Sequence, residues 1–285
     1  GSPGGRGGRG RRRRERGVID RGRHDVLGVL VDAVDYDRAV ATVMEAARER
    51  RPLAMTAAAS HVVMTGVQDP EHRHRLNALD MIVPDGQPVR WALNLLHGTA
   101  LAERVYGPEL MLRLCGAAAR EGLPVYFYGS NPPVLEPLRA RLLARFPELR
   151  IAGMRAGRFR RLTPDEHSAL VAEIRDSGAA VVFVGLGCPR QEVFVYENRE
   201  RIGVPLVAVG AAFDFHAGLV PQAPPAMQRN GLEWLFRLAH EPRRLWRRYL
   251  GLGPAYLWLV ALQLTGARRL DPAGAPAPRE ELGYG

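Results

Sequence analysis

The sequence predicts an α/β fold: a Rossmann-like, mostly parallel sheet flanked by helices, with an amphipathic helical appendage at the C-terminal side. From residue 25, short apolar runs alternate with stretches whose apolar residues recur at helical spacing. Such alternation is typical of parallel strands joined by crossover helices. After residue 230 this alternation stops, and arginine-rich and apolar helical patterns follow.

Each strand is predicted from a short apolar run bounded by turn residues, and each helix from its apolar spacing. The predicted strands are residues 25–34, 52–60, 80–86, 123–130, 149–157, 179–187 and 204–215. The predicted helices between them are residues 35–50, 61–79, 107–122, 132–147, 163–178 and 189–202. Thr163 and Glu166 form a capping-box pattern at the start of one helix, and Pro189 opens another.

Composition divides the chain into four parts. Residues 1–24 are an Arg/Gly-rich tail, expected to be disordered because it has almost no apolar residue to bury; a polyanion-binding arm is the alternative interpretation. Residues 25–230 form the α/β domain, residues 231–268 the helical appendage, and residues 269–285 a second tail that we expect to be disordered. The net charge of +10 therefore comes largely from the first tail.

The residue types exclude several kinds of chemistry. All 40 basic residues are arginine, which excludes a Schiff base, a lysine general base and a Walker-type phosphate loop. The cysteines, Cys115 and Cys188, are far apart and lack metal-site spacing, so we expect both to be reduced and unpaired in the cytoplasm. No Asp-x-Asp pair follows a predicted strand, so we expect no metal ion and no cofactor.

Ligands of open parallel sheets bind beyond the carboxyl ends of the strands. The polar or glycine-rich residues there are 56–60, 85–86, 129–130, 185–191 and 210–214. The stretch VGLGCPRQE, residues 184–192, reads as a strand, a turn and a helix start whose amides could bind an anion. A tight structural turn is the alternative. A dinucleotide-dependent oxidoreductase is disfavoured, because the third glycine of its fingerprint is missing.

Two further stretches carry candidate chemistry. In IVPDGQPV, Asp85 stands at a strand end. It is interpreted either as a general base or as a simple turn residue before glycine. In ERVYGPEL, Arg104 precedes a helix that starts near Gly107. It is interpreted either as a functional cation or as an ordinary surface arginine.

With the run from AFDFHAG to EPRRLWRRY, these stretches resemble the WecG/TagA/CpsF family of glycosyltransferases, over about residues 26–265. The resemblance implies inverting, metal-independent transfer of a sugar from a UDP-sugar to a polyprenyl-diphosphate-linked saccharide, in synthesis of cell-surface polysaccharide or teichoic acid. N-acetylmannosamine, its uronic acid or a hexose is the expected sugar. The sequence leaves open whether the protein forms a homo-oligomer. The rival class is a non-catalytic polyanion- or nucleic-acid-binding protein, which would leave Asp85 and Gln191 without a role.

The resemblance also implies roles for individual residues. Asp85 matches the general base, and Arg104 matches an arginine that stabilises the departing diphosphate. The donor-binding positions are Thr56, Gly185, Gly187 and Gln191. The positions for the acceptor diphosphate are Arg237, Arg244 and Arg247. The chain departs from the family pattern in three places: Ala58 replaces a frequent Asn, Glu109 a frequent Asp, and Cys188 a frequent Ser.

The C-terminal arginines fit an anionic membrane surface. Pro242 should divide residues 232–250 into two helices, because proline suits a first helical turn. From Arg243 onward, four arginines then fall within an arc of about 140°, opposite apolar side chains. Residues 250–264 are mostly apolar but shorter than the roughly 20 residues of a membrane span. We expect peripheral attachment at the cytoplasmic membrane face, and packing of this helix on the domain is the alternative.

Overall fold

The predicted fold class is confirmed by the computed structural model, which describes residues 18–240, 242–246 and 251–285. Its centre is a parallel six-stranded sheet. In spatial order the strands are β4 (Met81–Pro84), β3 (Leu53–Ala58), β8 (Pro205–Ala208), β7 (Val181–Gly185), β5 (Val125–Gly129) and β6 (Ile151–Arg155). Because all of them run in one direction, their carboxyl ends meet at one edge of the sheet.

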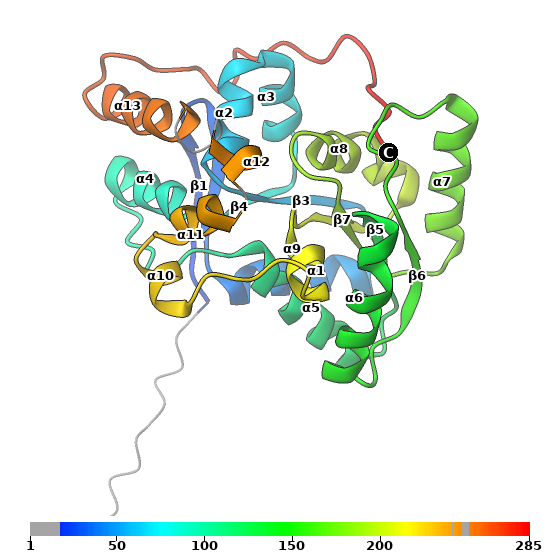
Figure 1. Cartoon of the computed structure of the whole chain (residues 1–285). Coiled ribbons are helices and arrows are strands. Elements are labelled where there is room, and N and C mark those ends of the chain that lie inside the picture. The colour runs from blue at the N-terminus through cyan, green and yellow to red at the C-terminus, as the bar shows by residue number, and fades with distance from the viewer. Residues whose placement is uncertain (1–17, 241, 247–250) are drawn as a thin grey trace, which may run out of the picture.

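Helices cover both faces of this sheet (Figure 1). On one face lie α1 (Tyr36–Arg48), α5 (Gly107–Glu121), α6 (Pro132–Arg145) and α9 (Ala212–Ala217). On the other lie α2 (Ser60–Gln68), α3 (Pro70–Asn77), α4 (Gln87–His97), α7 (Pro164–Asp176) and α8 (Arg190–Ile202). Strand β7 shows why both layers are needed, since Val181 and Phe183 face one core and Val182 and Val184 the other.

The first predicted strand is in fact a hairpin. β1 (Asp20–Val26) pairs antiparallel with β2 (Val29–Val34), separate from the main sheet. The turn between them places Leu27 and Gly28 at φ 56° and 82°, as two-residue hairpin turns require. Residues 20–24, expected in the disordered tail, therefore belong to a strand; residues 1–17 lie outside the described part of the chain.

Three other elements differ from the sequence-based expectation. The helix expected at 61–79 is divided into α2 and α3, because Asp69 before Pro70 is extended. The strand expected at 204–215 ends at Ala208, and the apolar run continues as α9. Helix α4, which directly follows Asp85-Gly86, was not expected at all.

The C-terminal helices are α10 (Pro225–Arg229), α11 (Glu233–His240), α12 (Pro242–Trp246) and α13 (Gly253–Leu264). The division at Pro242 is confirmed. Helix α13 buries Tyr256 and Val260 against the domain, and the Tyr256 hydroxyl donates to the Pro88 carbonyl at 3.2 Å. Its opposite side leaves Leu257 and Trp258 exposed. Within the described residues, no helix combines the length and apolar character that crossing a membrane requires.

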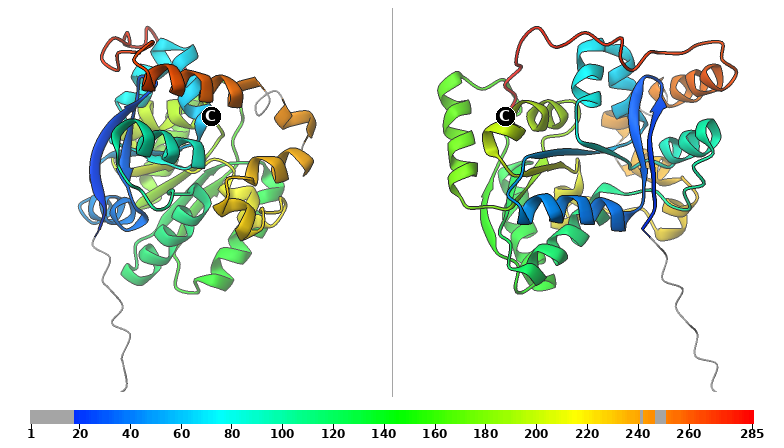
Figure 2. Two further views of the ribbon diagram at one scale, coloured as in Figure 1. Left: turned by 90° about the vertical axis from the view of Figure 1, so that its left-hand side faces the viewer. Right: turned by 180° about the vertical axis from the view of Figure 1, so that it is seen from behind.

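The last residues follow a defined path over α3 and α8, so the expectation of a disordered tail at 269–285 was wrong (Figure 2). Their contacts are polar. Arg201 on α8 binds Glu281 through two hydrogen bonds of 3.0 and 2.9 Å. The Glu197 carboxylate accepts the backbone N–H groups of Leu282 and Gly283. This tail has few apolar residues and is held by hydrogen bonds and ion pairs instead.

Candidate active site

Asp85 stands at the carboxyl end of β4, where its carboxylate meets the first turn of α5. Its Oδ1 accepts the N–H of Gly107 at 2.7 Å. A Cβ at Gly107 would lie 3.3 Å from both the Ala57 Cβ and the Val209 carbonyl oxygen, so α5 begins in close contact with the ends of β3 and β8. Glycine at 107 thus lets the helix start approach the Asp85 carboxylate.

Burial is the main reason that the pKa of Asp85 is raised above its ordinary value. The positive charge of Arg104 and the N–H of Gly107 act in the opposite direction, and the negative charge of Glu233 adds to the rise. A carboxyl group with a raised pKa is a stronger base once it has lost its proton.

Arg104 is held in place by a residue of the C-terminal appendage. Its Nη2 donates to Glu233 Oε2 at 2.5 Å, and both side chains are only 11% exposed. The Tyr106 hydroxyl donates to the other oxygen of Glu233 at 3.2 Å, and the Arg104 guanidinium lies 4.3 Å from the centre of the Tyr106 ring. Appendage and α/β domain therefore share one buried ionic cluster.

A cavity of about 410 Å³ opens beside this cluster. Arg104, Tyr106 and Gln87 line it from the sheet edge, and His216 and Gln228 from the segment after β8. Its walls carry arginine, amide and hydroxyl groups together with Glu103 and Glu109, so they suit a polar ligand with both anionic and hydroxyl groups. The Tyr36 hydroxyl, also in this wall, accepts the N–H of Tyr106 at 2.9 Å.

The expected donor residues form a second cluster next to the first. The Thr56 hydroxyl is fully buried and donates to Glu192 Oε1 at 2.9 Å. The Gln191 side chain donates to the same oxygen, and its own Oε1 accepts the N–H groups of Gly187 and Gly210 at 3.1 Å each. These residues thus brace the loops after β7 and β8. Because the Gly187 N–H donates to Gln191, it is not free for phosphate as the sequence suggested.

Glycines permit the close approach of β5 and β7 at this edge. The Ser130 N–H donates to the Gly185 carbonyl at 2.8 Å, and a Cβ at Gly129 would lie only 2.5 Å from that oxygen. The Ser130 hydroxyl donates to Asp214 Oδ1 at 2.9 Å. The structure therefore brings together the ends of β5, β7 and β8, all of which the strand-end rule had indicated.

Of the three arginines expected to bind the acceptor, only Arg237 has its side chain in the described part of the structure. Arg237 on α11 lies over the Phe215 ring at 5.2 Å, and its buried Nε has no hydrogen-bond partner among the described residues. Its charge acts on Asp85 and Tyr106, which places it at the same site. The side chain of Arg244, on α12, and the whole of Arg247 lie outside the described part of the chain.

Glu233 and Tyr106, which bind Arg104, are two of the site residues that the sequence did not indicate. Glu233 is an acidic residue in the first turn of a helix, a common position for an acid beside the helix dipole. Tyr106 directly precedes α5 and resembles any partly apolar side chain at a helix start. Neither position carries a signal of pairing with Arg104 until the chain is folded.

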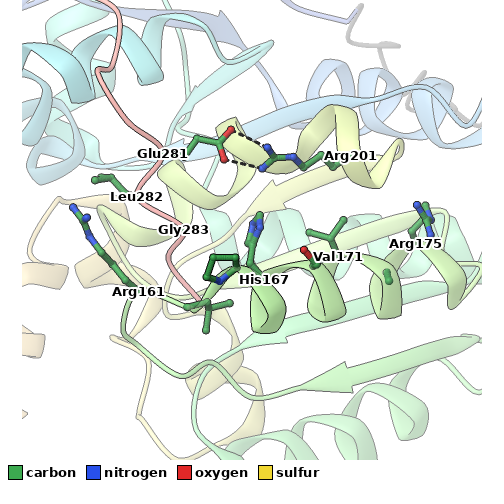
Figure 3. Close-up of a pocket in the computed structure, with 12 residues that line it drawn as sticks. Arg161, His167, Val171, Arg175, Arg201, Glu281, Leu282 and Gly283 are labelled. Carbon is green, nitrogen blue, oxygen red and sulfur yellow. Dashed lines mark hydrogen bonds and ion pairs between the residues drawn. The ribbon is translucent and has the colours of Figure 1, made fainter.

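A larger cavity of about 660 Å³ lies elsewhere, between α7, α8 and the C-terminal tail (Figure 3). Arg161, His167 and Arg175 line it together with the Arg201–Glu281 pair. It contains none of the residues that the sequence predicted for the site. The smaller cavity, which adjoins Arg104 and the strand ends, is therefore the better candidate active site.

Comparison with protein families decides the assignment. The family model described as "Glycosyl transferase WecG/TagA/CpsF family" matches residues 24–270, which is most of the chain. The chain belongs to the WecG/TagA/CpsF family. It is therefore a glycosyltransferase of cell-surface polysaccharide or teichoic acid synthesis, acting in general on a nucleotide-sugar donor and a lipid-linked acceptor.

Proposed function

We propose that this WecG/TagA/CpsF-family protein is an inverting glycosyltransferase that moves a sugar from a UDP-sugar to a polyprenyl-diphosphate-linked saccharide. N-acetylmannosamine, its uronic acid or a hexose is the proposed sugar. Asp85 removes the proton from the acceptor hydroxyl, whose oxygen bonds to the anomeric carbon as the bond from that carbon to the UDP oxygen breaks. UDP leaves as the anion, and Arg104 stabilises its developing charge.

The contact between Gly107 and Asp85 is the observation that carries this proposal. It occupies Oδ1 and orients the carboxylate, whose other oxygen, Oδ2, is proposed to face the acceptor. Arg104 is close enough to lower the pKa of Asp85, so base and cation serve one reacting centre. A panel of UDP-sugars, assayed for transfer to a synthetic lipid-diphosphate sugar, tests the proposal directly; failure with every donor would reject it.

We further propose that Gln191 and Thr56 position the donor loops through Glu192, and that Arg237, Arg244 and Arg247 bind the acceptor diphosphate. Guanidinium groups suit phosphate oxygens because they offer paired N–H donors. Ala58 stands where an amide is frequent in the family, so a donor contact from this position would be lost. The choice of sugar would then depend on neighbouring side chains.

Catalysis is proposed to need no divalent ion at the diphosphate. UDP should bind with the same affinity, and transfer should proceed at the same rate, when Mg²⁺ and Mn²⁺ are omitted, because arginines supply the positive charge. Calorimetry of UDP binding and a transfer assay with and without Mg²⁺ measure this. A strict requirement for Mg²⁺ would show that carboxylates bind a metal at the diphosphate instead.

Attachment to the membrane is proposed to use the outer surface of α11–α13. Trp234, Leu235, Trp246 and Trp258 are between 40% and 66% exposed there, and Arg243 is exposed next to them. Aromatic and apolar side chains beside arginine suit the interface of an anionic bilayer. The proposed location is the cytoplasmic face of the bacterial plasma membrane.

Arg243→Ala should weaken binding to anionic vesicles by about 1 kcal/mol, and less at high salt, because one cation leaves the charged surface. Co-sedimentation with vesicles containing anionic lipid measures the effect. Arg139→Ala, which removes an exposed arginine from α6, is the matched control and should bind as the unmodified protein does. Equal weakening by both substitutions would mean that only net charge matters.

A further inference from the structure

His72, Cys188 and Glu192 form a buried side-chain cluster that the proposed reaction does not use. His72 comes from α3, Cys188 from the loop after β7, and Glu192 from α8. Their potential ligand atoms, an imidazole nitrogen, a thiol sulfur and a carboxylate oxygen, all lie within 4.8 Å of one another. His72 is 3% exposed and Glu192 is fully buried. Cys188 and Glu192 are four residues apart, and folding brings His72 from a distant part of the sequence to the same point.

One of these ligand atoms lacks the partner that a buried polar atom normally has. His72 Nε2 is buried without a hydrogen-bond partner among the described residues. The Glu192 carboxylate interacts with the Cys188 thiol, so these two potential ligands already contact each other within the cluster. An unpaired polar atom in a protein interior destabilises the fold, and a cation bound between the three side chains would satisfy the lone pair of His72.

The surroundings of Glu192 prepare its second oxygen for this role. Its Oε1 accepts hydrogen bonds from the Thr56 hydroxyl and the Gln191 side chain, each at 2.9 Å. These two donors fix the plane of the carboxylate and occupy Oε1, so Oε2 remains available as a metal ligand. Hydrogen bonds of this kind orient ligating side chains in metal sites.

We propose that His72, Cys188 and Glu192 bind one zinc ion. Sulfur and imidazole ligands select zinc and similar transition metals, whereas Mg²⁺ requires oxygen ligands. The thiolate and carboxylate together carry two negative charges, so the occupied buried site is neutral. Zinc bonds of about 2.0–2.3 Å imply ligand atoms roughly 3.3–3.7 Å apart. The ligand atoms lie within 4.8 Å of one another, so binding requires only a small contraction of the cluster.

The bound ion would join α3 to the start of α8 and to the loop after β7. This loop also carries Gly187, which Gln191 holds at the proposed donor site. The zinc ion therefore stabilises the donor side of the fold and does not contact the reacting groups. Such a site is separate from the divalent-ion independence proposed for the transfer step, and either inference can fail without the other.

Cobalt(II) titration of the reduced, metal-free full-length protein tests the site. We expect about one equivalent to bind, with thiolate-to-cobalt absorption in the near ultraviolet and tetrahedral bands in the visible range, and zinc should remove both. Cys188→Ser and His72→Gln should weaken cobalt binding by at least roughly tenfold. Cys115→Ala is the matched control: it removes the other cysteine, which lies buried in α5, and should keep the spectrum.

Thermal unfolding gives a second measurement that does not depend on the spectrum. Zinc should raise the Tm of the unmodified protein and of Cys115→Ala, but not of Cys188→Ser, because ligands that bind only the folded state stabilise it. The proposal is overturned if the unmodified protein gives neither the thiolate band nor a Tm shift. It is also overturned if Cys188→Ser behaves like the unmodified protein.

Discussion

Asp85→Asn is expected to lower kcat for sugar transfer by roughly 10²- to 10⁴-fold, the usual contribution of a general base. The substitution removes the basic oxygen but keeps an amide oxygen that can accept the Gly107 N–H, now at 2.7 Å from the carboxylate. The fold and the affinity for UDP should therefore change little. Steady-state kinetics with a lipid-diphosphate acceptor, together with calorimetry of UDP binding, measure both.

Asp165→Asn is the matched control for this experiment. Asp165 is exposed in the first turn of α7, so the same chemical change there should leave transfer nearly unaffected. If folded Asp85→Asn protein turns over as fast as the control, Asp85 only closes the turn before α4 and another group acts as base.

Arg104→Gln should lower kcat by about 10²- to 10³-fold, comparable to the loss of one group that stabilises a developing anion. It should also destabilise the protein, because Glu233 stays buried without its cation. The double variant Arg104→Gln with Glu233→Gln separates these effects. It should recover part of the lost stability and none of the lost turnover. Recovery of both would make Arg104 a structural residue alone.

The pH dependence gives an independent reading of the same cluster. A general base must be ionised, so kcat/KM rises as the pH passes the pKa of Asp85. Arg104 lowers this pKa, so Arg104→Gln should move the acidic limb of the profile to higher pH. Glu233 raises it, so Glu233→Gln should move the limb to lower pH. Shifts in the same direction would show that Asp85 is not the titrating group.

Most elements of the sheet could be predicted because their signals are local. A buried strand such as Val181–Gly185 is a short apolar run ending in glycine, and α7 begins with a capping box that the sequence itself displays. The prediction was wrong after Ala208, where an apolar run is compatible with either a strand or a short buried helix. Residues after Ala208 are as apolar as a strand, yet Gly210 at φ 60° turns the chain and α9 follows. Periodicity alone does not separate a short buried helix from a strand.

The candidate site shows the same division between local and distant information. Asp85, Arg104 and Gln191 were indicated because each follows a strand or precedes a helix in a recognisable motif. Glu233 was not, because 129 positions separate it from Arg104 and only folding brings the two together. The zinc ligands were hidden for the same reason, since His72 and Cys188 have no metal-type spacing in the sequence.

The sequence by itself therefore determined the α/β class, most strand and helix positions, and the strand ends at which the chemistry should lie. These follow from apolar periodicity, proline and glycine, whose effects act within a few residues. Only the tertiary structure decided the strand order, the partner of Arg104, the orientation of Gln191 toward the loop amides and the path of the last residues. The reason is physical: such pairings depend on which surfaces meet when apolar faces are buried, and that is a property of the whole chain.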